Sequence, residues 1–161
     1  MNAMDVVRFG HLTLLGTLEP SAMDVIDRPG ACGNWSVKDI VAHLGSYELV
    51  LIGILDEVSG DGSSTILDQY RDLGPEFNDA EVIKRRDQDF DGVLNELNRA
   101  HGTVLERLST FTPERLGFGG TIPWYGDEYS LDDLLVYMYY GHKREHAAQI
   151  AVFREAGSAK R

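Results

Sequence analysis

The sequence contains a single cysteine, Cys32, among its 161 residues. One thiol cannot form a disulfide within the chain, so this composition suits a reducing compartment and we expect a cytoplasmic protein. Cys32 lies in a Pro-Gly-Ala-Cys-Gly turn with no histidine near it in sequence. That setting favours an inert thiol over a catalytic nucleophile.

Positive charge is also scarce. The chain has 15 lysines and arginines against 26 acidic residues, which gives a formal net charge of −11. Such a protein repels a phosphate backbone unless it carries a local basic patch. The densest basic run, Lys84-Arg85-Arg86, is followed at once by Asp87 and Asp89, and we interpret it as a solvated helix face. We therefore expect no nucleic-acid partner.

Long apolar runs and cofactor motifs are missing as well. No stretch is long enough to span a bilayer, and no basic segment precedes a short apolar one near the first residue, so no membrane association is expected. No glycine-rich phosphate loop follows a predicted strand, and neither Ser46 nor Ser130 stands in a nucleophile elbow. Any chemistry must come from another kind of site.

Helical periodicity dominates what the sequence does contain, and its length suits one domain over residues 1–161. No segment alternates apolar and polar residues over a useful length, as a strand would, so the expected fold class is all-α. The predicted helices cover residues 4–26 with a break at Pro20, 36–58 with Ser36 as N-cap, 79–108, and 130–155 with Ser130 as N-cap and Gly157 as a stop signal.

Two long connections separate these helices. The second and third are joined by a polar stretch and a short helical segment that reaches Phe77. This connection is long for a hairpin in a bundle and indicates a crossover. The loop over residues 110–129 contains Trp124 and Tyr125, whose rings need a surface to pack on. We expect this loop to fold back over the bundle as the wall or lid of a pocket.

The most informative functional pattern is a histidine pair, His142 and His146, on the last predicted helix. Residues four apart share one helix face, so two imidazoles at this spacing can bind one metal ion. Both lie on the apolar stripe, where unpartnered rings would be costly to bury. His43 lies beside the inward stripe of the second helix, one helical step from Tyr47. His101 is interpreted as a hydrogen-bonded core histidine, with a role beside the ligands left open.

Glu145 turns the pair into the string His-x-x-Glu-His. That string also occurs in inverted zinc peptidases, where the glutamate is the general base. The chain is short for a peptidase, and few residues follow His146 to supply a carboxylate ligand. Glu145 could instead orient a ligand or move a proton as the catalytic residue of the site, or simply lie on the surface.

Two segments resemble the signatures of the DinB-like superfamily. Trp-Ser-Val-Lys-Asp-Ile-Val-Ala-His-Leu over residues 35–44 is similar to its second-helix signature. Gly-His-Lys-Arg-Glu-His-Ala-Ala-Gln-Ile over residues 141–150 is similar to its fourth-helix signature. The segments are well separated and in the family's order, and helix number and length also agree. The resemblance implies a four-helix bundle with a long crossover between the second and third helices.

The same resemblance implies a divalent metal (zinc, nickel or iron) held by three histidines, which here are His43, His142 and His146. Relatives include mycothiol-dependent maleylpyruvate isomerase and bacillithiol or glutathione S-transferases. Pro-Trp-Tyr-Gly over residues 123–126 is similar instead to the colibactin self-resistance hydrolases, a subgroup without the triad, and favours hydrolysis or ligand sequestration. Because the triad is complete here, the metal-binding branch is the better match.

The leading hypothesis is a metal-dependent thiol S-transferase or isomerase acting on a small electrophile. The chain offers no well-placed cysteine, so a low-molecular-weight thiol would be a second substrate. Tyr47, Trp124 and Tyr125 are the candidate substrate-pocket residues. The alternatives are a hydrolase that activates water, a non-enzymatic protein that sequesters a small toxin, and a structural metal with Glu145 or His101 as fourth ligand. A homodimer is compatible with such a bundle, but no motif specifies one.

Overall fold

The computed structural model describes residues 2–18, 25–62 and 64–158. Within these ranges the fold is all-α, and the only extended pairing is an isolated bridge between Cys32 and Trp35. The helical elements in chain order are α1 (Ala3–Thr17), α2 (Val37–Ser59), α3 (Thr65–Leu73), α4 (Glu76–Lys84), α5 (Phe90–Leu108), α6 (Pro113–Leu116), α7 (Leu131–Leu134), the π-helix η2 (Leu135–Gly141) and α8 (His142–Ser158).

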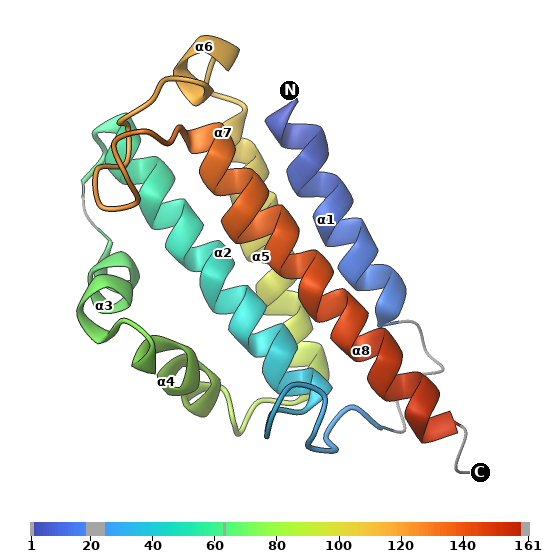
Figure 1. The fold of residues 1–161 in the computed structure, drawn as a ribbon. Helices are drawn as coiled ribbons and strands as arrows, with labels where there is room; N and C mark the ends of the chain where they lie inside the picture. Colours follow the sequence, from blue (N-terminus) through green and yellow to red (C-terminus); the bar gives the residue numbers. More distant parts are fainter. Residues whose placement is uncertain (1, 19–24, 63, 159–161) are drawn as a thin grey trace.

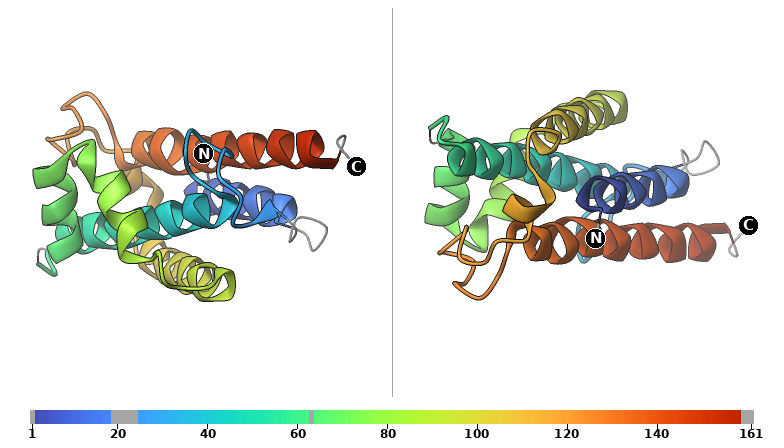
Figure 2. Two further views of the ribbon diagram at one scale, coloured as in Figure 1. Left: turned by 90° about the horizontal axis from the view of Figure 1, so that it is seen from below. Right: turned by 90° about the horizontal axis from the view of Figure 1, so that it is seen from above.

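Four long rods form the bundle: α1, α2, α5, and the continuous run of α7, η2 and α8 (Figure 1). In that view α1 and α8 run from top to bottom, whereas α2 and α5 both run upward. Because α2 and α5 are parallel, the chain must return along the length of the bundle between them. The short helices α3 and α4 make this crossover along one side (Figure 1 and Figure 2). The predicted all-α bundle with a long crossover is confirmed.

Two capping boxes determine where the helices that carry the site begin. Ser36 Oγ accepts a hydrogen bond from the Asp39 amide at 3.1 Å, and the Asp39 carboxylate accepts one from the Ser36 amide at 2.9 Å. Ser130 and Asp133 repeat this arrangement at the start of α7. Each box satisfies amides that the first helical turn leaves free, and both predicted N-caps are confirmed.

The apolar core consists of two clusters stacked along the bundle. One includes Leu51, Ile54 and Val104 and reaches α6 and α7, and the other includes Leu44 and Leu97 and lies toward the start of α2. Between these clusters, four buried polar side chains, one from each of the four long rods, contact one another. These four residues are His11, Glu48, His101 and Lys143. A polar layer therefore crosses the middle of the core, between the two apolar clusters.

The prediction of a third helix over residues 79–108 is wrong at the N-terminal end of that helix. α4 ends at Lys84, and α5 begins at Phe90 after Asp89, whose carboxylate accepts a hydrogen bond from the Gly92 amide at 2.7 Å. A short acidic side chain satisfies free amides at a helix start better than it serves a helix interior, so Asp89 acts as an N-cap. The crossover consequently contains two short helices where one was expected.

The basic run is also different from the prediction, because Arg85 is buried. Its guanidinium lies 2.7 Å from a carboxylate oxygen of Glu81 and 2.7 Å from one of Glu96. Lys84 and Arg86 are exposed, as expected of a solvated face. Glu81, Arg85 and Glu96, here called the crossover cluster, form an ion cluster between α4 and α5.

The outer helices differ from the prediction at their ends. α1 ends before Val25 and Ile26, and Pro20 falls outside the described residues. α8 continues through Gly157 to Ser158, so this glycine is not a stop. Among the residues described, no helix is long and apolar enough to cross a membrane.

Candidate metal centre

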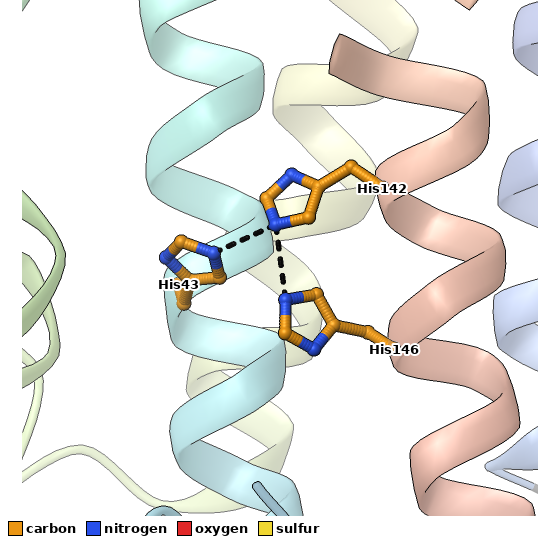
Figure 3. A group of neighbouring side chains, drawn as sticks. All are labelled: His43, His142 and His146. Atoms are coloured by element: carbon orange, nitrogen blue, oxygen red, sulfur yellow. Dashed lines mark hydrogen bonds between the residues drawn. The ribbon is translucent and has the colours of Figure 1, made fainter. Parts of the chain in front are cut away.

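Three histidines from two helices converge inside the bundle (Figure 3). His43 comes from α2, and His142 and His146 come from the start of α8. The Nε2 atom of His142 lies 3.0 Å from Nε2 of His43 and 3.0 Å from Nε2 of His146. One nitrogen from each ring lies within 4.8 Å of the others. The structure thus brings together the three histidines that the sequence analysis assigned to a metal.

Hydrogen bonds orient two of the three rings from behind. Nδ1 of His146 lies 2.8 Å from the side-chain oxygen of Gln149, so this nitrogen carries the proton and donates it. The His142 ring bonds to the backbone of Met138, and because its Nε2 faces the other rings, Nδ1 makes that bond. In both rings Nε2 keeps its lone pair, as a metal ligand requires. The remaining outer nitrogen, His43 Nδ1, is buried without a hydrogen-bond partner among the described residues.

The three converging nitrogens fit a metal ion better than they fit hydrogen bonds to one another. His142 Nε2 can share a proton with only one neighbour, which would leave two lone pairs 3.0 Å apart at the other contact. A tetrahedral ion about 2.0 Å from each nitrogen holds its ligand nitrogens about 3.3 Å apart, close to the two 3.0 Å contacts that His142 makes. The cluster of described residues contains no carboxylate or thiol. A bound ion would keep a coordination position open.

The surroundings hold the imidazoles in the neutral form that metal binding needs. Burial, reinforced by the two neighbouring rings, lowers the pKa of His43 to about 2. Burial and His146 lower the pKa of His142 to about 4, although the bond to Met138 opposes this. Burial also lowers the pKa of His146. At neutral pH the three rings are therefore uncharged, each with a proton on only one of its two nitrogens.

A π-helical segment immediately precedes the histidine pair. It spans Leu135–Gly141, and α8 begins at His142. The wider turn of a π-helix rotates the residues that follow it relative to a regular α-helix. A Cβ at position 141 would lie only 3.2 Å from the Val136 carbonyl oxygen, so glycine relieves crowding in this turn. The helix predicted from Ser130 is continuous, but its register changes just before the ligands.

An aromatic row leads from the triad to the loop before α7. The Tyr47 ring meets His43 and His142 edge-on, with centroids 4.7 and 4.8 Å away. Tyr47 meets Tyr70 at 5.8 Å, and Tyr70 meets Trp124 at 6.0 Å. The row connects the predicted pocket residues to the histidines through Tyr70, a residue that the sequence analysis did not select.

The loop before α7 folds back over the bundle, as predicted. Tyr125 packs against the apolar cluster. Trp124 remains 38% exposed, with the guanidinium carbon of Arg71 5.3 Å from its ring centroid. The two loop rings therefore differ: one anchors the loop and the other faces solvent. That Tyr47, Trp124 and Tyr125 line a substrate pocket stays a prediction.

Glu145 lies on the exposed face of α8, between two of the histidines in sequence. Burial lowers the pKa of His146, and the Glu145 carboxylate opposes this as a weaker effect. A catalytic role for Glu145 stays a prediction. His101, considered as a fourth ligand, faces Glu48 instead, with Nδ1 3.2 Å from its carboxylate. It is the hydrogen-bonded core histidine that the sequence analysis expected.

The polar layer of the core lies beside the triad, and we call it the ionic layer: His11, Glu48, His101 and Lys143. The Lys143 ammonium nitrogen lies 2.5 Å from one carboxylate oxygen of Glu48, and His101 contacts the other. His101 stacks on His11 with ring centroids 3.8 Å apart and planes 12° apart. Nε2 of His11 lies 2.9 Å from the side-chain oxygen of Asn98.

The sequence analysis missed Glu48 and Lys143, although one signal was available. Glu48 follows Leu44 by four residues and precedes Leu51 by three, so it stands on the buried stripe of α2. A carboxylate in that position is rarely buried without a charged partner. The position of Glu48 on the helix could have indicated that a charged partner exists. It could not have identified Lys143, because that residue is on another helix.

The fold and the site together define a class of protein: a helical bundle with a three-histidine cluster suited to a divalent metal. Comparison with protein families makes this specific, because the chain matches the family model of the DinB superfamily over residues 10–150. The protein therefore belongs to the DinB superfamily, and all three histidines fall within the matched region. No curated protein and no solved structure matches the chain.

Proposed function

We propose that this protein binds one divalent metal ion (zinc, nickel or iron) through His43, His142 and His146, and uses it in thiol-dependent S-transfer to, or isomerisation of, a small electrophile. The observation that carries the proposal is the convergence of three neutral Nε2 atoms, with no fourth ligand in their cluster among the residues that the structure describes. A structural site would be closed by a fourth ligand. An open site has room for a substrate.

A bound metal would supply the acidity that activates a thiol or a water molecule. The residues of the chain would bind and orient the electrophile. Tyr47 lies edge-on to two of the ligands, and burial and Tyr70 raise its pKa to about 12, so its phenol remains protonated. In the structure the Tyr47 hydroxyl donates a hydrogen bond to the Asn78 side-chain oxygen at 3.2 Å. A polar group of a substrate could accept the same hydrogen.

Glu145 is the proposed proton acceptor of the site. Its carboxylate is exposed and is close enough to His146 to affect the pKa of that ring. An exposed carboxylate exchanges protons freely with solvent, which suits repeated turnover. Glu145→Gln should lower the rate of turnover while the protein retains its metal. A variant with parental turnover would remove Glu145 from the mechanism.

Metal content is the first test of the proposal. We expect protein purified without added metal to contain or take up one equivalent, measured by elemental analysis, and to gain thermal stability with zinc, nickel or iron. The triple variant His43→Ala, His142→Ala, His146→Ala should do neither, whereas His11→Gln, which removes a buried histidine outside the triad, should do both. A metal-free native protein that none of the three ions stabilises would overturn the proposal.

Turnover rates on a panel of electrophiles, measured with and without thiol, show whether the nucleophile is a thiol or water. With the metal-loaded protein, turnover should require glutathione, bacillithiol or mycothiol and should yield thioether or isomerised products. Turnover that is independent of thiol would favour the hydrolase instead. Each rate is compared with that of the triple-histidine variant at the same metal concentration.

The aromatic row favours a second candidate function, sequestration of a small apolar molecule without chemistry. Trp124 is 38% exposed although it contacts Tyr70, so part of this aromatic side chain is open to solvent. Under this alternative, Trp124→Ala abolishes binding of the apolar molecule and His146→Ala leaves it intact. Under the metal-dependent function, His146→Ala is the damaging change. Binding measured by tryptophan fluorescence and by calorimetry separates the two.

A further inference from the structure

Two polar connections join α2 to α8. The triad is the first, because His43 lies on α2 and the other two histidines lie on α8 (Figure 3). The second is the ion pair between Glu48 on α2 and Lys143 on α8. Apart from these, α2 packs mainly on α5, while α8 packs mainly on α1. The orientation of α8 relative to α2 therefore depends largely on these polar contacts.

The ion pair is well placed to control the triad because Lys143 follows His142 directly in the chain. Lys143 is 2% exposed and Glu48 is fully buried. A buried ammonium must keep its carboxylate partner, so the rotation of α8 at this residue has little freedom. Burial alone would raise the pKa of Glu48, but Lys143 and His101 outweigh it, and the carboxylate stays charged. The pair is thus a persistent, directional contact.

The π-helix makes such a contact necessary. η2 ends at Gly141, one residue before the first ligand. A π-turn can be relieved by returning to α-helical geometry, and that change would rotate the following residues by about a third of a turn. The histidines would then face away from α2. Apolar side chains tolerate small rotations, whereas the Glu48–Lys143 pair is satisfied in one rotation only.

We propose that Glu48 and Lys143 are positioning residues of the metal centre, which hold the first turn of α8 in the rotation that places His142 and His146 opposite His43. They act through the α8 backbone and do not bind the metal. The inference rests on the metal-binding function proposed above and adds to it the residues that fix how the three rings face one another.

The test uses a pair of double variants. Glu48→Met with Lys143→Met removes both charges at nearly constant volume, a replacement that often leaves stability unchanged or raised. The control, Glu81→Met with Arg85→Met, removes a buried ion pair from the crossover cluster, remote in sequence from the triad. Zinc affinity is measured by chelator competition, and the cobalt-substituted proteins are compared by visible absorption, which reports coordination geometry.

We expect the Glu48/Lys143 variant to bind zinc about tenfold more weakly than the parent, in the range found when residues supporting metal ligands are changed. Its cobalt absorption bands should also shift or weaken, an effect that loss of stability alone does not produce. The Glu81/Arg85 control should keep the parental affinity and spectrum. Parental affinity and spectrum in the first variant, or an equal loss in the control, would overturn the inference.

Glu48→Gln is the second variant, for the case that the double variant does not fold. It keeps the shape of the side chain and an acceptor for Lys143 but removes the charge. We expect zinc affinity to fall by a few-fold, and an unchanged affinity would again overturn the inference. A parent that binds none of zinc, nickel, iron and cobalt would refute the metal proposal itself, whereas a parent that binds like its variants would refute only the positioning role.

Discussion

The five histidines of this chain form two groups with different chemistry. In the triad, three rings meet edge-on or tilted and point their Nε2 atoms at one another. In the ionic layer, His11 and His101 stack nearly parallel, and each bonds to a neighbouring side chain. Four of the five rings are buried and His142 is half-buried, so burial does not distinguish the groups.

The two groups differ in whether the protein itself supplies a positive charge beside the rings. The ionic layer holds its own cation, the Lys143 ammonium, with the Glu48 carboxylate to balance it. The triad consists of neutral donors with no cationic side chain among them. A metal ion would complete the triad and would be repelled by the cation of the ionic layer. The number of histidines is thus a weaker indication of a metal site than their arrangement. The stronger indication is that imidazole lone pairs converge where no lysine or arginine side chain supplies a positive charge.

Among the variants that test this contrast, Lys143→Met alone should cause the largest loss of stability. This change removes the cation that balances the buried Glu48 charge and leaves His101 as its neighbour. Removing one partner of a buried ion pair typically costs about 3–5 kcal/mol. Urea unfolding of the metal-free protein gives the free energy of unfolding. The double variant with Glu48→Met should recover most of the loss. A single variant as stable as the parent would show that the ion pair does not hold the core.

The next largest effect concerns His142→Ala. At a zinc concentration a thousandfold above the dissociation constant, the parent should gain about 4 kcal/mol of stability from the bound ion. The variant should gain almost none, while its metal-free stability should match or exceed that of the parent, because a desolvated ring has been removed. Thermal unfolding with and without zinc measures both quantities. His11→Gln, the control from the other group, should keep the zinc-dependent gain.

Acid should affect the ionic layer through His11. Burial, with Lys143 and His101, lowers the pKa of His11 to about 4 from its ordinary value of 6.5. Between these values the unfolded chain binds the proton and the folded one does not, so stability falls as the pH drops from about 6.5 to about 4. The contribution is up to about 3 kcal/mol. In urea unfolding of metal-free protein, His11→Gln should lose that much less stability over the same range; equal losses would contradict the prediction.

The smallest effect is expected at the edge of the aromatic row. Trp124 is 38% exposed and gains its contacts from Tyr70 and Arg71. Trp124→Ala should therefore cost less than about 1 kcal/mol of stability and leave zinc affinity unchanged. A larger loss of stability, or a change in zinc affinity, would show that the loop supports the triad as well as covering the bundle.

Much of the fold could be predicted because it depends on neighbours in sequence. Ser36 with Asp39, and Ser130 with Asp133, are capping pairs three residues apart, and both start helices as expected. Asp89 is the counterexample. Its capping role was missed because helical periodicity seemed to continue across it, and this produced one helix where the structure has two.

The candidate site was partly predictable for the same reason. His142 and His146 are four residues apart, and a regular helix brings such residues to one face. His43 could be added only through family resemblance, since nothing local relates it to α8. The burial of Arg85 and Lys143 could not be predicted, because each pairs with a carboxylate on another helix, Glu96 for Arg85 and Glu48 for Lys143.

The sequence by itself determined the helical class, the helix starts and the face that His142 and His146 share, since all of these follow from interactions within a few residues. The tertiary structure alone decided that His43 meets that pair, that a π-turn sets the rotation of α8, and that Lys143 turns inward to Glu48. Those outcomes depend on burial. A charged or polar side chain enters the core only where a partner from another helix meets it.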